Sequence, residues 1–107
     1  MQDLTKGAKD VLAERQRQVE GEGWTPEHDD QHSAGELAEA ASSYSHLAAY
    51  QCVFLFDCSN FPAPCIWPWE KDVWKPGETP RRSLVKAGAL ILAEIERLDR
   101  AAEVRHG

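Results

Sequence analysis

The sequence predicts an all-α fold with three main helices, covered by an ordered loop rich in tryptophan and proline. Apolar residues recur at helical spacing over residues 3–20, 33–56 and 80–102. Residues 57–79 hold four of the six prolines, which excludes a helix or a central strand in that stretch. A chain of 107 residues has room for one hydrophobic core, so we expect a single helical domain over residues 1–107.

The first and last helices have recognisable ends. Gly21 and Gly23 end the first helix. Thr79 followed by Pro80 predicts the start of the last one, because threonine caps helices well and proline suits the first helical position. Residues 84–93 are apolar on almost every side of this helix, so we expect it to be the central and most buried element.

The second helix has a start signal of its own. Ser33 followed three residues later by Glu36 forms a capping box, in which each side chain caps a free backbone amide of the first turn. We expect the helix to continue through Cys52–Phe56, with an irregular buried segment as the alternative for those residues.

The loop at residues 57–79 carries three of the four tryptophans, Trp67, Trp69 and Trp74. Burying indole rings is strongly favourable, so this composition predicts an ordered cover over the helices. Tryptophan rings also stack on nucleobases. We expect most of these rings to anchor the loop and one of them, Trp74 or Trp69, to contact a ligand.

Charge and composition exclude several classes of protein. The formal net charge of -6 argues against general nucleic-acid binding. The longest apolar runs are too short to cross a bilayer, and the first six residues contain no hydrophobic signal core. Three cysteines without a CxxC element indicate free thiols, namely Cys52, Cys58 and Cys65. We therefore expect a cytosolic protein, in the host cytoplasm if a phage encodes it.

Three cations near the start of the last helix predict a bound anion. Arg81 and Arg82 stand in its first turn, where the helix dipole disfavours positive charge. Lys86 follows one turn later within an apolar stretch. A phosphate would suit the free amides and the guanidinium groups together. Two alternatives stay open: a carboxylate of the chain itself is the anion, or the lysine stem reaches solvent.

An acidic segment with two histidines precedes the second helix. His28, Asp29, Asp30 and His32 lie within five residues, next to Trp24. We expect them to close a ligand pocket or to bind ribose hydroxyls. Imidazole and carboxylate groups together also suit a transition metal, although the spacing matches no standard metal motif. A hydrogen-bonded loop that caps helix ends is a further interpretation.

Two carboxylates at the start of the second helix form a candidate magnesium site. Glu36 and Glu39 are three residues apart, and paired carboxylates can share Mg²⁺ together with water and substrate phosphates. The capping box and exposure to solvent explain the same two residues without a metal. No nucleophile elbow and no glycine-rich phosphate loop occurs in the sequence.

Motifs from nearly the whole chain carry one family resemblance. They are Glu14, Arg15, Gln18, Glu22–Thr25, His28–Asp30, His32, Gly35–Ala38, Trp67–Trp69, Trp74–Pro76 and the stretch from Arg81 to Arg100. In these residues the chain resembles a family of small phage and prophage proteins of unassigned activity. The resemblance implies a phage or prophage setting.

A shorter motif, Gly35–Ala40, is similar to the first metal-binding helix of the MazG-like all-α nucleotide pyrophosphohydrolases. That resemblance implies Mg²⁺ at Glu36 and Glu39 and cleavage of nucleoside triphosphates. The family has a second Glu-x-x-Asp helix, whose counterparts here are Lys86 and Ala89. The departure replaces negative charge by positive charge and favours direct binding of phosphates.

We interpret the chain as a non-catalytic binding protein that sequesters a small phosphorylated ligand, a nucleotide or a nucleotide-derived signal such as a host defence messenger. Such a role needs no cofactor, and a homodimer would help to enclose a pocket. The first alternative is a divergent Mg²⁺-dependent nucleotide pyrophosphohydrolase. The second is a protein that inhibits a host factor through its tryptophan-rich loop.

Overall fold

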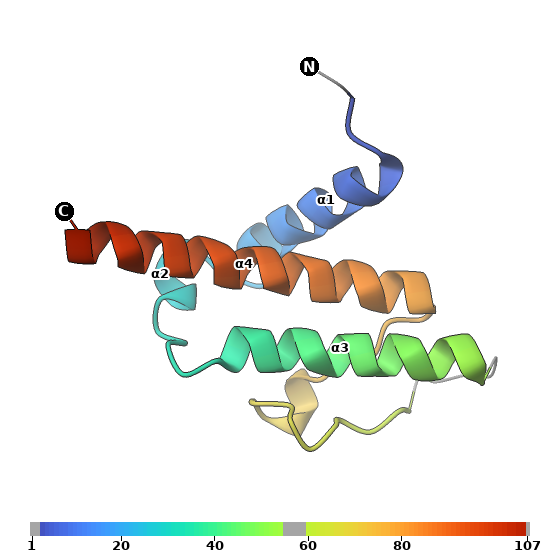
Figure 1. The fold of residues 1–107 in the computed structure, drawn as a ribbon. Coiled ribbons are helices and arrows are strands. Elements are labelled where there is room, and N and C mark those ends of the chain that lie inside the picture. The colour runs from blue at the N-terminus through green and yellow to red at the C-terminus, as the bar shows by residue number, and fades with distance from the viewer. Residues whose placement is uncertain (1–2, 55–59, 107) are drawn as a thin grey trace.

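Two long antiparallel helices form the centre of the fold in the computed structural model, which describes residues 3–54 and 60–106 (Figure 1). The helices are α1 (Lys6–Gly21), α2 (Pro26–Asp29), α3 (Glu36–Val53), the 3-10 turn η1 (Lys71–Val73) and α4 (Pro80–His106). No strand occurs in the described ranges. The prediction of an all-α fold with three main helices is confirmed, and α2 is a short fourth helix that the sequence did not predict.

Small side chains let α3 and α4 pack closely. Ala40, Ala41, Ala87 and Ala93 are all buried in the main core cluster, together with Leu37, Leu47 and Leu90. Close packing of this kind places many atoms in van der Waals contact, which stabilises the pair of helices. Helix α1 lies across α4 on the side away from the loop (Figure 1).

The tryptophan-rich loop is an ordered cover over its described residues 60–79. Trp67 and Trp74 are buried in the core cluster, and the ring of Trp74 stacks on Tyr44 with 4.7 Å between centroids. The indole of Trp74 donates a hydrogen bond of 2.8 Å to the carbonyl of Phe61. These rings tie the loop to α3, so the predicted cover is confirmed there, while residues 57–59 lie outside the described residues.

A buried polar contact fixes the end of the loop. The Gln51 amide donates to the Gly77 carbonyl at 2.8 Å, and the Ser83 hydroxyl donates to the Gln51 side-chain oxygen at 2.8 Å. A Cβ atom at Gly77 would lie 2.5 Å from the Ser83 hydroxyl oxygen. Only glycine therefore fits here, and the chain enters α4 in a defined position.

The predicted capping box at Ser33 is wrong. Helix α3 begins at Glu36 and has Gly35 as its N-cap, with a left-handed backbone (φ 88°) that favours glycine. The Glu36 carboxylate instead accepts a hydrogen bond of 2.7 Å from the amide of Ala34. The helix ends at Val53, so its predicted continuation is too long by at least one residue; Leu55 and Phe56 lie outside the described residues.

The predicted start of α4 is confirmed, but its predicted burial is not. The Thr79 hydroxyl accepts a hydrogen bond of 3.0 Å from the Arg82 amide, and the helix begins at Pro80. One face of α4 is partly exposed, including about half of Leu84 and of Ile91. Among the described residues, none of the helices combines the length and the hydropathy that a membrane-spanning segment requires.

Candidate ligand-binding site

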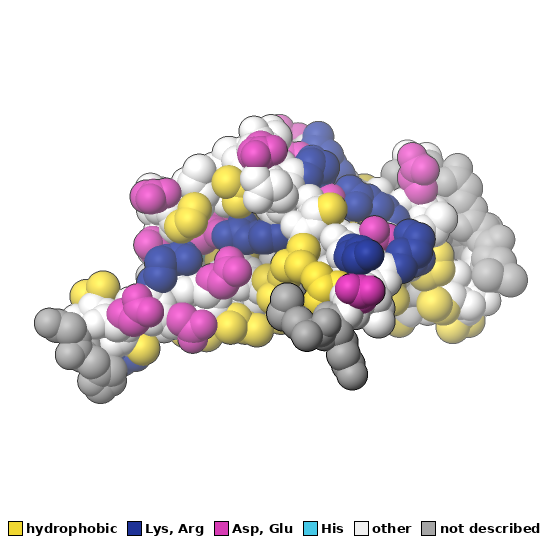
Figure 2. Space-filling view, turned by 90° about the horizontal axis from the view of Figure 1, so that it is seen from above, with side chains coloured by type: hydrophobic (Ala, Val, Ile, Leu, Met, Phe, Trp, Pro, Cys, Tyr) yellow, Lys and Arg dark blue, Asp and Glu magenta, His cyan; other side chains and the backbone are white. Residues whose placement is uncertain are grey.

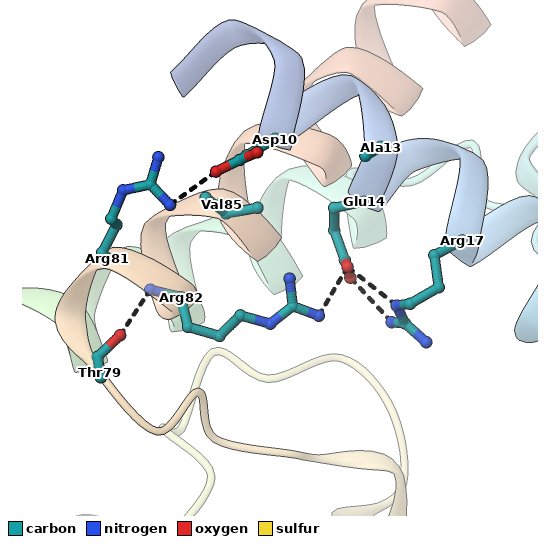
Figure 3. Close-up of a pocket in the computed structure, with 8 residues that line it drawn as sticks. All are labelled: Asp10, Ala13, Glu14, Arg17, Thr79, Arg81, Arg82 and Val85. Carbon is teal, nitrogen blue, oxygen red and sulfur yellow. Dashed lines mark hydrogen bonds and ion pairs between the residues drawn. The ribbon is translucent and has the colours of Figure 1, made fainter. Parts of the chain in front are cut away.

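The two arginines at the start of α4 are held by carboxylates of α1. Arg81 lies 2.9 Å from Asp10, and Arg82 lies 2.7 Å from Glu14 (Figure 3). Seen from above, Lys and Arg side chains lie beside Asp and Glu side chains over this part of the molecule (Figure 2). The unfavourable position of these arginines therefore does not require an external anion, and the open alternative of a carboxylate from the chain itself is what occurs.

Glu14 is the centre of this arrangement. Its side chain is buried, with a residue exposure of 3%, and it also accepts two hydrogen bonds from Arg17, at 2.9 and 2.8 Å. Burial raises the pKa of Glu14, but the hydrogen bonds from Arg17 and Arg82 outweigh it and leave the pKa below its ordinary value. Glu14 thus stays charged and holds two guanidinium groups next to each other.

Lys86 has different surroundings from the two arginines. Its ammonium group donates a hydrogen bond of 2.9 Å to the carbonyl of Lys75 and lies 5.4 Å from the centre of the Tyr44 ring. Among the described residues, no carboxylate lies within ion-pair distance of it. Burial lowers the pKa of Lys86, and the nearby charge of Arg82 lowers it further. The charge on this lysine is thus only partly compensated.

The side chain of Lys86 lines a cavity of about 220 Å³, which we call the cationic cavity. Its lining residues are Arg17, Glu22, Trp24, Tyr44, Val73, Lys75, Arg82 and Lys86. Four of them are cations and one is a carboxylate, so even with Glu14 beside them the cations exceed the carboxylates, four to two. The cavity therefore has an excess of hydrogen-bond donors with positive charge.

A second hollow, of about 390 Å³, lies next to it; we call it the aromatic pocket. It is lined by Trp24, His28, His32, Pro68, Trp69, Glu70 and Val73. The ring centroids of Trp24 and Trp69 are 5.8 Å apart, and those of His32 and Trp69 are 5.2 Å apart. Trp24 and Val73 line both hollows, so the two are adjacent and share a wall.

Each histidine of the aromatic pocket has a carboxylate beside one ring nitrogen. The distance is 3.6 Å from Nδ1 of His28 to Asp29 and 3.5 Å from Nδ1 of His32 to Glu36. The Nδ1 atom of His28 is buried and makes no hydrogen bond among the described residues. A carboxylate therefore lies on the Nδ1 side of each ring.

Besides Arg81, the structure places three of the predicted ligand-binding residues away from both hollows. Trp74 is buried in the core against Tyr44, so it is an anchor of the loop, and its predicted stacking on a base is wrong. Asp29 is fully buried and binds Arg15 at 2.7 Å. Asp30 binds Arg100 at 2.8 Å. These two carboxylates hold α2 in place, which corrects the prediction that they close the ligand pocket or bind ribose hydroxyls.

Arg15 contacts several elements besides α2. Besides Asp29, its guanidinium donates to the carbonyl of Trp24 at 3.2 Å and to Glu96 of α4 at 3.4 Å. Each guanidinium nitrogen of Arg15 thus has an acceptor, whereas the buried Oδ1 atom of Asp29 makes no hydrogen bond among the described residues. The contacts of Arg15 thereby position Trp24 and the two histidines of the aromatic pocket.

The two candidate magnesium ligands lie at the start of α3. Glu36 is engaged by the Ala34 amide and lies beside His32, while Glu39 is partly buried. Within residues 3–54 and 60–106 there is no group of three or more His, Cys, Asp or Glu side chains placed to hold a metal ion. Two carboxylates alone would leave most positions around Mg²⁺ to water or to a substrate.

Eight residues that line the two hollows escaped the sequence-based prediction, among them Arg17, Trp24, Tyr44 and Lys75. Arg17 reads as one of many charged residues on α1, and Tyr44 reads as part of the apolar stripe of α3. Their common feature, a shared cavity, appears only after α1, α3 and the loop are brought together. The one local signal was Trp24, an exposed-looking ring beside two histidines.

Comparison of the chain with protein-family models, with curated proteins and with solved structures found no match. The geometry of the site therefore carries the functional argument alone. The phage-family and MazG-like resemblances stay predictions.

Proposed function

We propose that this protein binds and sequesters a small phosphorylated ligand, most simply a nucleotide or a nucleotide-derived signal. The observation that carries the proposal is Lys86, a half-buried ammonium without a carboxylate partner in a cavity that also contains Arg17, Lys75 and Arg82. An anion bound there would offset the cost of burying the lysine charge.

The adjacent aromatic pocket supplies the second half of the argument. Flat rings on its walls, Trp24 and Trp69, offer stacking surface to a planar base, and each stacked base contributes on the order of 1–3 kcal/mol. Because the two hollows share Trp24 and Val73, one molecule can place its phosphates in the cationic cavity and its base in the aromatic pocket.

Sequestration is favoured over hydrolysis by the residues of α4. At the positions where the MazG-like pattern has carboxylates, this chain has Lys86 and Ala89. A cation at that place binds a phosphate directly and does not help to hold Mg²⁺. In a phage setting, the proposal corresponds to removal of a nucleotide messenger that a host uses in defence.

The decisive experiment measures nucleotide binding to Lys86→Met by isothermal titration calorimetry, with ATP, ADP, AMP and pyrophosphate as probes. The substitution keeps the apolar stem and removes the charge, so we expect affinity for the phosphorylated probes to fall about tenfold or more. The matched control is Lys9→Gln, which removes an exposed lysine of α1 outside both hollows and should leave affinity unchanged.

Three outcomes would contradict the proposal. Equal affinity of wild type and Lys86→Met would remove the cationic cavity as the phosphate site. Conversion of ATP to AMP and pyrophosphate in the presence of Mg²⁺, detected by chromatography, would make the protein an enzyme instead. No binding of any probe, combined with capture of one host protein through the tryptophan-rich loop, would favour the inhibitor alternative.

A further inference from the structure

Tyr44 is a buried residue of α3 whose hydroxyl group uses only one side of its hydrogen-bonding capacity. The residue retains 4% of its accessible surface, and its ring stacks on Trp74. The hydroxyl oxygen accepts a hydrogen bond of 3.4 Å from the amide of Lys75, but the hydroxyl proton has no acceptor among the described residues. Burial raises the pKa of Tyr44 to about 12, so the hydroxyl keeps this proton at neutral pH and can donate it to a bound molecule.

Lys86 is held by the same residue of the loop. Its ammonium group donates a hydrogen bond of 2.9 Å to the carbonyl of Lys75 and lies 5.4 Å from the centre of the Tyr44 ring. An ammonium group has three N–H donors, and only one of those on Lys86 has an acceptor among the described residues. Tyr44, Lys75 and Lys86 all line the cationic cavity. Unpaired donors of two side chains therefore lie close together at one wall of this cavity.

The charge of the cationic cavity indicates which kind of phosphate fits it. Its four cations exceed the two nearby carboxylates, Glu14 and Glu22, by two. A phosphate monoester carries a charge of about -1.5 to -2 at pH 7 and has three terminal oxygens that accept hydrogen bonds. A phosphodiester carries a single negative charge and has one terminal oxygen fewer. A monoester therefore matches both the excess charge and the set of unpaired donors.

We infer that Tyr44 and Lys86 form a subsite of the cationic cavity for a terminal phosphate monoester. The hydroxyl of Tyr44 and the ammonium group of Lys86 donate to its terminal oxygens, while Arg17, Lys75 and Arg82 supply the remaining positive charge. The subsite, which rests on the proposed function, narrows the ligand class to molecules that end in a free phosphate group. Cyclic nucleotides, whose phosphates are diesters, lie outside that class.

The first test compares three ligands of the wild-type protein by isothermal titration calorimetry: AMP, the methyl ester of AMP and adenosine 5′-sulfate. The methyl ester has the same nucleoside but is a diester. The sulfate retains all three terminal oxygens but has a single negative charge, so it separates the effect of charge from that of shape. We expect AMP to bind about tenfold or more tightly than either of the other two, because hydrogen bonds strengthen with the charge of the acceptor.

The second test is Tyr44→Phe, which removes the hydroxyl and retains the ring that stacks on Trp74. We expect affinity for AMP to fall about tenfold and affinity for the methyl ester to fall by less than about threefold, because the lost hydrogen bond is stronger to the dianion. Tyr50→Phe is the matched control. It makes the same change at the other tyrosine of the chain, which lines neither hollow, and should leave both affinities unchanged.

The outcomes separate this subsite from the proposed function. Equal affinity of the wild type for AMP and its methyl ester would overturn the subsite and leave phosphate binding in place, as would equal losses for both ligands in Tyr44→Phe. Tighter binding of cyclic 3′,5′-AMP than of AMP would assign the cavity to a diester. Absence of binding for every phosphorylated probe would contradict the proposed function and the subsite together. If thermal unfolding shows that Tyr44→Phe does not fold, the ligand comparison on the wild-type protein decides alone.

Discussion

Both sides of α4 near its start carry cations, but the cations toward α1 have carboxylate partners, whereas Lys86, toward the loop, has none among the described residues. Toward α1, Arg81 and Arg82 meet Asp10 and Glu14 at ion-pair distance (Figure 3). Toward the loop, Lys86 meets a backbone carbonyl and an aromatic ring. The first side is an internal contact that holds two helices together, and the second retains positive charge for a ligand. A cation indicates a binding site only when its neighbouring carboxylates have been counted.

Removal of Glu14 should have the largest effect on the contact between α1 and α4. Glu14→Ala leaves Arg17 and Arg82 side by side without their shared carboxylate, and we expect the free energy of unfolding at pH 7 to fall by about 3 kcal/mol. Urea denaturation followed by circular dichroism measures it. Glu20→Ala is the control, since Glu20 is exposed on the same helix, and it should change stability by less than about 0.5 kcal/mol. A small loss in Glu14→Ala would mean that this side of α4 is not held by charge.

The pKa of Glu14 adds a pH signature to the same contact. Because the folded-state pKa lies below the ordinary value of 4.5, the carboxylate stabilises the fold above pH 4.5. This stabilisation is lost as the pH falls through the folded-state pKa. We therefore expect the difference in stability between wild type and Glu14→Ala to shrink steadily below pH 4.5. A difference that is constant from pH 7 to pH 3 would contradict the assignment.

A substitution in the aromatic pocket tests the side of α4 that faces the ligand. Trp69→Ala removes one wall of the aromatic pocket, and we expect nucleotide affinity to fall by about 2 kcal/mol while pyrophosphate affinity stays the same. Calorimetry with both probes measures the difference. Ile66→Ala, an exposed position of the same loop outside the pocket, is the control. An equal loss for nucleotide and pyrophosphate would show that Trp69 supports the cavity as a whole and does not stack on a base.

The smallest effect is expected at the outer ion pair. Asp10→Asn weakens the contacts of Asp10 with Arg81 and with Lys6, all of which are open to solvent. Exposed ion pairs contribute little to stability and are screened by salt. We expect a small loss in low salt and almost none in 1 M NaCl, measured by thermal unfolding. A larger loss that persists in high salt would place this pair with Glu14 among the contacts that hold the helices.

Local patterns predicted the fold well because they depend on neighbours in the sequence. Helical spacing gave the three main helices, and Thr79 with Pro80 gave the start of α4 within one turn. The Ser33 capping box failed because Gly35 adopts a left-handed backbone and takes the cap position. Ser33 and Glu36 have the residue types of the motif, but the motif does not specify the backbone conformation of Gly35, two residues after Ser33.

The candidate site was predictable only in part, because it depends on distant residues. His28, His32 and Trp69 were predicted and lie together in the aromatic pocket. The partner of Arg82 lies 68 residues away on α1, and no pattern near Arg82 indicates it. Pairing of that kind is a property of the packed helices.

The guanidinium of Arg15 has a consequence for how a ligand would act on the molecule. By joining α1, α2 and the turn at Trp24, it makes the amino-terminal third one piece, while Trp69 belongs to the loop anchored on α3. A planar molecule held between Trp24 and Trp69 would connect these two pieces as a brace. Binding of this ligand would then slow the separation of the amino-terminal helices from the rest of the chain.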